Sequence, residues 1–260
     1  MRSGPQRIVC LTEETTEWLY LLGEQHRIVG ISAYTVRPPE AKETKPVVSA
    51  FISGSVSKIQ GLKPDLVVGF SDIQGELAKT LIQEGLNVLV FNQRSIEEIF
   101  QVMETVAAIV HQSQRGAQLI GQMRQKISGM QVRAASLKKR PRVFFQEWDD
   151  PLITTIRWVS EAIEIVGGED CFSERRVCAM AKDRIVDANE VAARNPDLII
   201  GSWCGKAVDF DWIKQKSEWA QVPAVKNNRL YEIDSAEILQ PGPALFLSGL
   251  DRLSEIITSF

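Results

Sequence analysis

The stretch SIEEIFQVMETVAAIVHQSQRGAQLIGQMRQKISGMQVRAASLKK (residues 95–139) carries the longest helical pattern in the chain. Ser95 and Glu98 have the spacing of a capping box, which predicts that a helix begins here. Apolar residues then recur every three or four positions as far as Met130, so one face of a helix stays buried. More than about thirty helical residues would span roughly 50 Å. We therefore expect one long helix that runs between two domains.

The segments on either side of this helix are similar to each other. KIQGLKPDLVVGF (58–70) precedes it and EVAARNPDLIIGSW (190–203) follows it. Each runs from a helical pattern through Pro-Asp into an apolar run. The strand patterns that start at Arg7 and Arg142 are separated by nearly the same interval. These matched intervals indicate a duplicated architecture. The alternative is that Pro-Asp followed by β-branched residues is a common entry to a buried parallel strand.

Strand and helix patterns alternate in both halves of the sequence. Strands are expected at 7–11, 27–31, 66–69, 88–91, 143–145, 199–200 and 230–233. The connection 32–57 has little helix signal, and long irregular connections are often functional. Alternation of this kind predicts parallel sheets with helices on both faces. The expected fold is α/β with two doubly wound lobes: residues 1–94 and 140–260, joined by the helix 95–139.

Composition narrows the classes of function. A chain of 260 residues that is 44% hydrophobic can form two medium-sized cores. Its net charge of −3 and lack of long basic runs argue against nucleic acid as a partner. No apolar run approaches the ~20 residues of a membrane span, and no signal peptide is visible. We expect a monomer that is cytoplasmic as the chain stands, and periplasmic or otherwise extracytoplasmic if a leader was removed.

Aromatic and polar residues gather where the predicted strands end. Ligands of open α/β sheets bind beyond the carboxyl ends of the strands, and large flat side chains suit a bulky, partly apolar ligand. An alternative for each tryptophan is that it fills the core or covers the interface of the lobes. The predicted ligand-binding residues are Thr12, Glu13, Tyr34, Phe51, Phe70, Trp148, Trp158, Trp203, Cys204 and Glu237.

Catalysis has little support. Glu147, Asp149 and Asp150 could act as acid and base, but the two histidines, His26 and His111, are not placed to join a site. Cys204 follows a strand without a histidine to serve as its base. The four cysteines are too irregularly spaced for disulfides or zinc, and no nucleotide-binding glycine motif occurs. We expect no catalytic residues, no metal site and no enzyme.

Four stretches carry a family resemblance: RIVCLTEETTEWLYLLG with VGISAYTVRPPEA, IQGLKPDLVVGFSDIQGELAKTL, VFFQEWDDPLITTIRWVSEAIEIVGGEDCF and VKNNRLYEIDSAEILQPGPAL. In their order and spacing they resemble the class III, helical-backbone substrate-binding proteins of ABC importers. Members of this class carry cobalamin, haem and iron-siderophores. The resemblance covers nearly the entire chain and is closest to the cobalamin-binding branch.

The resemblance implies a corrinoid, cobalamin or a relative of it, bound without a covalent link between the lobes. Phe51 and Phe70 would touch it from the first lobe, and Trp148, Trp203 and the loop 235–239 from the second. It also implies an ABC permease as partner, docked through an acidic residue of each lobe. Glu76 stands at the first docking position. At the second, the best match is Leu239, with Glu237 the nearby acid.

Two alternatives remain open. Haem or a ferric siderophore could replace the corrinoid, and a siderophore site usually needs arginines, for which Arg37, Arg94 and Arg157 are candidates. The two-lobed plan also resembles metal chelatases of tetrapyrrole synthesis. Those enzymes need a histidine at the site, and this chain has none near a predicted strand end.

Overall fold

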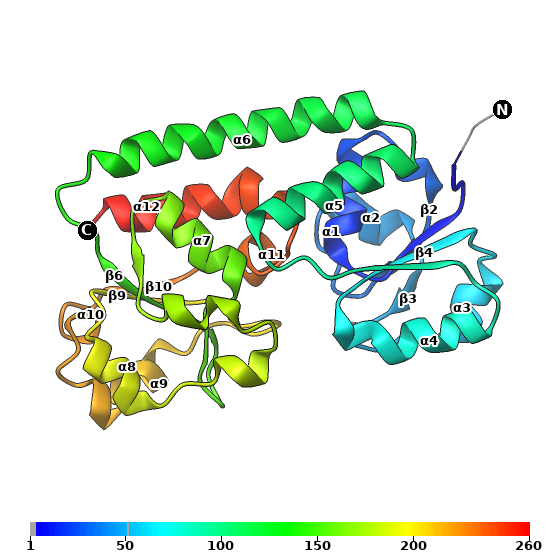
Figure 1. The fold of residues 1–260 in the computed structure, drawn as a ribbon. Helices are drawn as coiled ribbons and strands as arrows, with labels where there is room; N and C mark the ends of the chain where they lie inside the picture. Colours follow the sequence, from blue (N-terminus) through cyan, green and yellow to red (C-terminus); the bar gives the residue numbers. More distant parts are fainter. Residues whose placement is uncertain (1–3, 51) are drawn as a thin grey trace. The chain divides into compact units, whose positions relative to one another are not determined.

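The computed structural model describes residues 4–50 and 52–260, which form two compact units (Figure 1). Unit 1 comprises the described residues up to Gln93 with Glu97–Gln122 and Pro241–Ala244. Unit 2 comprises Arg94–Ile96, Met123–Gln240 and Leu245–Phe260. Each unit contains one five-stranded, mainly parallel sheet. The predicted α/β fold with two such sheets is confirmed, whereas the three-part division at 94 and 139 stays a prediction.

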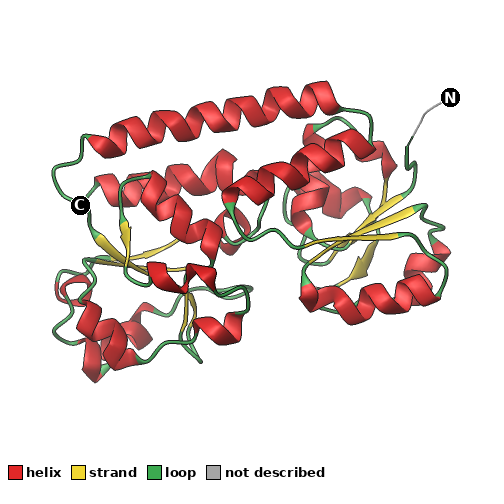
Figure 2. Cartoon of the chain, viewed as in Figure 1, coloured by secondary structure: helices red, strands yellow, loops and turns green. Residues whose placement is uncertain are grey.

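Unit 1 is a parallel sheet in the order β3-β2-β1-β4-β5 with helices on both faces (Figure 2). Its elements are β1 (Ile8–Cys10), α1 (Glu13–Leu21), η1 (Gln25–Arg27), β2 (Ile28–Ser32), α2 (Pro39–Thr44), β3 (Val47–Ser49), α3 (Val56–Gly61), β4 (Leu66–Phe70), η2 (Asp72–Gln74), α4 (Gly75–Gln83) and β5 (Val88–Phe91). Ile59 of α3 and Leu81 of α4 pack with Val9 and Val67 of the sheet. Connection 32–57 is less irregular than expected, because it holds α2 and the edge strand β3.

Unit 2 has the sheet order β10-β9-β6-β7, and β8 also pairs with β6. All its pairings are parallel except that of β7. Its strands and helices are β6 (Arg142–Trp148), β7 (Ile153–Thr154), α7 (Arg157–Ile165), β8 (Glu169–Asp170), η3 (Ser173–Val177), η4 (Ala181–Arg184), α8 (Ala188–Arg194), β9 (Leu198–Gly201), α9 (Phe210–Gln215), η5 (Ser217–Trp219), α10 (Pro223–Lys226), β10 (Leu230–Glu232), α11 (Ser235–Ile238), the π-helical turn η6 (Leu245–Gly249) and α12 (Leu250–Thr258).

The predicted helix over 95–139 is two helices, α5 (Ile96–Ile109) and α6 (Ser113–Ala135). At the break, His111 adopts a left-handed φ of 60°. The amide of Gln112 donates to the Ala107 carbonyl and that of His111 donates to the Ala108 carbonyl, which is a Schellman ending. Gly116 of α6 then approaches Ala107 so closely that a Cβ on it would lie 2.6 Å from the Ala107 Cβ. The 23-residue α6 is therefore the long helix that contributes to both units.

An aspartate fixes the central strand pair of each unit. In unit 1 the Asp65 carboxylate accepts hydrogen bonds from the amides of Gln6 and Arg7, at 2.6 and 2.9 Å, and the Asp65 amide donates to the Arg7 carbonyl at 2.9 Å. In unit 2 the Asp197 carboxylate accepts from the amide of Arg142 at 2.9 Å, and the Asp197 amide donates to the Arg142 carbonyl at 2.8 Å. The two Pro-Asp motifs thus make the same contact.

The strand registers of the two units follow from this contact. One residue after each partner, Ile8 lies opposite Leu66 in unit 1 and Val143 lies opposite Leu198 in unit 2. A one-residue slip would exchange the two faces of a strand. The aspartate therefore helps to select the register in which the buried faces of both strands meet their helices.

Removal of this carboxylate should destabilise unit 2. We expect Asp197→Ala to lower the free energy of unfolding by about 1–3 kcal/mol, because the partly buried Arg142 amide loses a charged acceptor. Asp197→Asn, which keeps one acceptor oxygen, should cost less. Chemical denaturation followed by circular dichroism measures the change. The exposed Asp211→Ala is the matched control, for which about 0.5 kcal/mol or less is expected. Equal effects of Asp197→Ala and the control would contradict this role.

Candidate functional site

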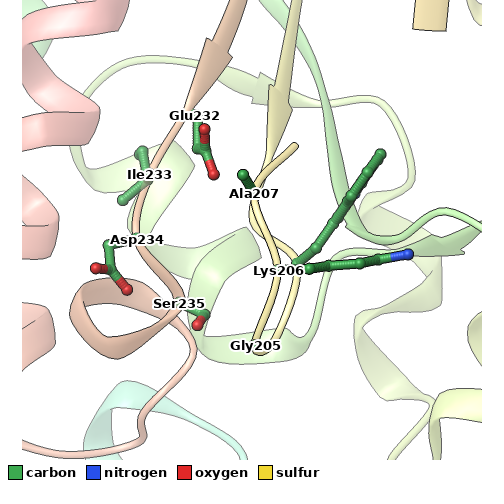
Figure 3. A pocket seen from close by; sticks show the side chains of 8 residues that line it. Gly205, Lys206, Ala207, Glu232, Ile233, Asp234 and Ser235 are labelled. Atoms are coloured by element: carbon green, nitrogen blue, oxygen red, sulfur yellow. The ribbon is translucent and has the colours of Figure 1, made fainter. Parts of the chain in front are cut away.

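A cavity of about 590 Å³ opens in unit 2 where β9 and β10 end (Figure 3). In Figure 3 the segment 232–235 forms one wall and the loop 205–207 forms the opposite wall. The cavity lies at the carboxyl edge of a parallel sheet, the usual position of ligand sites in this class of fold. Its lining residues are Trp203, Gly205, Lys206, Ala207, Glu232, Ile233, Asp234 and Ser235.

Local backbone structure explains why these two loops face each other. β9 and β10 are parallel, with Glu232 opposite Gly201, so both strands end at the same level. Gly201 has no side chain, and Val208 of the following loop packs where its Cβ would stand, at 2.7 Å. The loop therefore returns close to the strand from which it came, and Gly205 makes its turn with a φ of 77°.

Two carboxylates of the cavity wall are held by backbone amides. Glu232 accepts a hydrogen bond from the amide of Val208 at 3.1 Å, which ties β10 to the opposite loop. Asp234 accepts from the amide of Ala236 at 2.8 Å and so caps α11. Both side chains are anionic acceptors in fixed positions. A ligand with N–H donors at its edge would suit them.

Trp148 and Trp203 contribute two aromatic faces that share one lysine. The Lys206 ammonium lies 4.4 Å from the centroid of the Trp148 ring and 4.9 Å from that of Trp203. It also donates to both carboxylate oxygens of Asp149, at 2.8 and 2.7 Å. Burial alone would raise the pKa of Asp149, but the hydrogen bond and charge of Lys206 hold that pKa below its usual value.

The indole nitrogen of Trp203 is a second sign of a ligand site. The residue is only 3% exposed, and within the described part of the chain Nε1 has no hydrogen-bond partner. A buried donor without a partner is costly unless water or a ligand meets it. Trp212 packs edge-on against the Trp203 ring, at 5.9 Å between centroids, and holds that ring in place.

The surroundings of Cys204 and Glu147 indicate structural roles for both residues. Desolvation, with a smaller contribution from the nearby Glu147 charge, raises the pKa of the Cys204 thiol to about 11. The thiol therefore stays protonated and is a weak nucleophile at neutral pH. Glu147 forms an ion pair with the buried Arg184, which also donates to the Thr154 carbonyl at 2.5 Å. This pairing joins β6 to η4.

In unit 1 the predicted residues follow three neighbouring strands. Thr12 and Glu13 come after β1, Tyr34 after β2 and Phe70 ends β4. Tyr34 is 52% exposed, whereas Thr12, Glu13 and Phe70 are buried. The predicted contact Phe51 lies outside the described residues. Three exposed apolar side chains also follow strands of this sheet: Val36 after β2, Ile52 after β3 and Ile73 after β4. Their only sequence signal is their position after a strand.

Three buried glutamates begin α1. Burial raises the pKa of Glu13 to about 8, with the charges of Glu14 and Glu17 as further causes. Burial also raises the pKa of Glu14 to about 7, although a hydrogen bond from the Thr12 hydroxyl opposes the shift. The pKa of Glu17 is raised by burial despite its 2.9 Å ion pair with Arg37. Near neutral pH this cluster holds at least part of its protons.

The other predicted residues lie elsewhere. Trp158 of α7 is buried and its Nε1 donates to the Ile238 carbonyl at 3.0 Å, which makes it part of the core of unit 2. Glu237 lines a neighbouring cavity of about 430 Å³ with Arg252 and Glu255, and this cavity shares Glu232, Ile233 and Asp234 with the first. Glu76, on α4, has a side chain that is 92% exposed and lies 3.5 Å from Lys79. Trp203 and Ser235 therefore line one cavity, and Trp148 is connected to that cavity through Lys206, whereas Trp158 is not part of it.

Neither a metal centre nor a membrane span is found within residues 4–50 and 52–260. No three His, Cys, Asp or Glu side chains of this part gather as ligands of an ion. Likewise, none of its helices is long and apolar enough to cross a bilayer.

Sequence comparisons identify relatives along nearly the full chain. The model of a family described as periplasmic binding protein matches residues 8–237. An uncharacterised ABC transporter substrate-binding lipoprotein of Bacillus subtilis is 25% identical, over 99% of this chain and 81% of its own length. A vitamin B12-binding protein of Vibrio parahaemolyticus is 26% identical, over 92% of this chain and 84% of its own length.

Solved structures share the fold. The periplasmic vitamin B12 binding protein of Vibrio cholerae aligns with a TM-score of 0.77 and 24% identity, over 98% of both chains. The periplasmic heme-binding protein of Roseiflexus sp. RS-1 aligns with a TM-score of 0.84 and 22% identity, over 98% of this chain and 99% of its own. At such identities the likeness establishes the architecture and leaves the ligand open.

The buried glutamates of α1 should make stability depend on pH. Because the folded pKa values of Glu13 and Glu14 exceed the usual value near 4.3, the folded state binds more protons than the unfolded state between about pH 5 and 8. The free energy of unfolding should therefore fall as pH rises through this range, by about 1.4 kcal/mol per pH unit for each such proton. Denaturation at pH 6, 7 and 8 measures the slope.

Glu13→Gln should flatten this slope and stabilise the protein at pH 8, since the amide cannot ionise in the site shared with Glu14, Glu17 and Arg37. The exposed Glu76→Gln is the control and should keep the slope of the parent protein. An unchanged slope in Glu13→Gln would show that Glu13 is not the group that titrates.

Proposed function

This chain belongs to the periplasmic binding protein family, and we propose that within this family it binds a corrinoid of the cobalamin type. The family consists of substrate-binding proteins of class III that are not enzymes, so the expected class of protein and the expected lack of catalysis are confirmed. The chain is an ABC transporter substrate-binding protein of the branch that serves cobalamin, haem or siderophores. The metal chelatase alternative is not retained.

One observation carries the choice of a corrinoid. Trp203 lines one cavity with two carboxylate acceptors, Glu232 and Asp234, and Lys206 of the same cavity connects Trp203 to the Trp148 ring. A corrinoid is a large ring fringed with neutral amide groups, whose N–H donors match acceptor oxygens while the ring covers aromatic faces. The ligand would be held without a covalent bond. In unit 1 we retain Thr12, Glu13, Tyr34 and Phe70 as proposed contacts.

Charge argues against a ligand with a carboxylate rim. Arg37 and Arg157, which a siderophore could use, are already paired with Glu17 and Glu161, both at 2.9 Å. Among the described residues that line the cavity, Lys206 is the only cation, and it is bound to Asp149. A haem propionate or an anionic siderophore would meet Glu232 and Asp234. Haem remains the second candidate because relatives of this fold bind it.

The proposed place of action is outside the cytoplasm. A relative of 25% identity is described as a lipoprotein and one of similar fold as periplasmic, which supports this compartment. A substrate-binding protein of an importer meets its ligand and its permease there. The proposed partners are therefore the small-molecule ligand and an ABC permease.

Titration with cyanocobalamin tests the ligand. We expect saturable one-to-one binding with a sub-micromolar Kd, which corresponds to about −8 kcal/mol or better, by calorimetry and tryptophan fluorescence. Trp148→Ala should weaken binding at least about tenfold, because a flat aromatic face of the proposed ring site is lost. Trp148→Phe keeps a flat face and should lose less.

Haemin is the comparison ligand in the same experiment. Saturable binding of haemin without binding of cyanocobalamin would replace the corrinoid by haem. Binding of cyanocobalamin that does not change in Trp148→Ala would move the ligand away from the proposed cavity.

Docking to the permease is proposed to use Glu76 and Glu237. Glu76 is exposed on α4, where an opposite charge of a partner can reach it. Glu237 is half-buried and lines a cavity of unit 2 together with other acidic residues and Arg252. Their use is supported by the resemblance to the importer proteins and by the exposure of Glu76. Neither residue needs to touch the ligand for this role.

Charge reversal separates docking from ligand binding. We expect Glu76→Lys to lower ligand-dependent ATPase stimulation of the cognate permease several-fold in proteoliposomes, with an unchanged Kd for the ligand, because like charges would face each other. Lys79→Glu, one helical turn away, is the control for nonspecific effects of charge on α4. Full stimulation by Glu76→Lys would contradict the docking role.

A further inference from the structure

Lys206 holds an unusual position in the candidate site. Its ammonium contacts the faces of Trp148 and Trp203 at once, both within the range of a cation–π interaction, and is bound by Asp149. We propose that Lys206 is a specificity-determining residue: it covers both tryptophan faces until a flat ligand displaces it, and it discriminates between ligands by the charge of their rim. This inference rests on the proposed function and names the ligand class more narrowly.

Displacement is structurally easy. The Lys206 side chain is 42% exposed, and its loop is exposed from Cys204 to Ala207. Gly205 stands in open space, with no atom within 4 Å of the place where a Cβ would be. The lysine can therefore leave the rings by rotation of its own bonds, and no core contact has to break.

The contacts that Lys206 gives up are individually weak. Lys206 is partly exposed, and at such a site a cation–π contact and an ion pair each correspond to about two- to fivefold in an equilibrium constant. The combined free energy of these contacts is large enough to lower the affinity of a ligand that must displace Lys206 from the two rings. It is small enough for a large flat ligand to offset by its own stacking. Lys206 should thus reduce the affinity of a neutral flat ligand without blocking it.

A charged rim changes this balance. Glu232 and Asp234 would repel a carboxylate of the ligand, and among the described lining residues only Lys206 could neutralise it. For a ligand with a carboxylate, the displaced ammonium becomes a counter-ion. For a neutral, amide-fringed ligand it is only a competitor for the ring faces. Removal of Lys206 should therefore affect the two ligands in opposite directions.

The chain offers a matched control in the same unit. The Lys216 ammonium lies 3.8 Å from the centroid of the Trp212 ring and 5.5 Å from that of the buried Trp219. This lysine repeats the arrangement of one cation over two indoles, but it does not line the cavity. Lys216→Ala removes the same type of contact without uncovering Trp148.

The decisive experiment compares two nearly identical ligands: cyanocobalamin and a monocarboxylic acid derivative in which one side-chain amide is hydrolysed. Kd values are measured by calorimetry at pH 7 for the parent protein, Lys206→Ala and Lys216→Ala. We expect Lys206→Ala to bind cyanocobalamin about three- to tenfold more tightly and the acid more weakly, so that the preference for the amide rises at least about tenfold. Lys216→Ala should leave both Kd values within about twofold.

Asp149→Asn provides a second, independent variant. This substitution weakens the ion pair that holds Lys206 but keeps the lysine ammonium. It should therefore lower the Kd for cyanocobalamin by a smaller factor than Lys206→Ala does, and leave the preference between the two ligands nearly unchanged. Circular dichroism and thermal melting of each variant verify that the fold is intact.

The outcomes separate this inference from the proposed function. Suppose that cyanocobalamin binds the parent protein but that Lys206→Ala weakens this binding, or leaves the preference for the amide over the acid unchanged. Lys206 is then not a displaceable cover, and this inference fails while the proposed function stands. If only haemin binds, the corrinoid proposal fails. The role of Lys206 is then tested by comparing the Kd values of haemin and its dimethyl ester in the same variants. If neither type of ring binds, both proposals fail.

Discussion

The contact between an aspartate carboxylate and the amide before the first strand is the constraint on which both units depend. Asp65 and Asp197 each fix the register of two neighbouring central strands, and so decide which strand ends meet at the edge of the sheet. In unit 2 this edge carries Trp203 and, after β10, Asp234 and Ser235. The site is thus a consequence of strand register, because a slip of one residue would turn these side chains to other faces.

Carboxylates at the ends of strands are a second common element: they are exposed in unit 2 and buried in unit 1. Glu232 and Asp234 are charged acceptors of backbone amides, at a cavity that water can reach. The glutamates of α1 are more deeply buried, and burial shifts their pKa values upward. Negative charge is therefore favoured at the edge of unit 2 and resisted at the edge of unit 1. Each edge, taken by itself, therefore disfavours an additional anion.

Much of this architecture could be predicted from the sequence, because strand entry through Pro-Asp and the alternation of strand and helix are local patterns. The break between α5 and α6 could not, since His111 rather than glycine adopts the left-handed conformation and the apolar spacing continues across it. The edge strand β3 is only three residues long and gave no pattern of its own. Trp148 and Trp203 were predicted as ligand contacts from their place at the ends of strands, and the same reasoning selected Trp158, which is buried in the core of unit 2. Lys206 was missed because a lone exposed lysine has no sequence signal; only its distance to two rings distinguishes it.

A site with this chemistry explains how one fold can serve several flat ligands. The strand ends supply aromatic faces. These faces do not distinguish ligands by the groups at the edge of their rings, because every flat ring has a face that can stack on them. Discrimination must then come from charges on the loops, where single substitutions leave the sheet unchanged. In this chain those charges are two fixed carboxylates and one mobile ammonium. The balance between them favours a neutral rim, and a single further cation on the loop 204–207 would be enough to shift it toward a carboxylate.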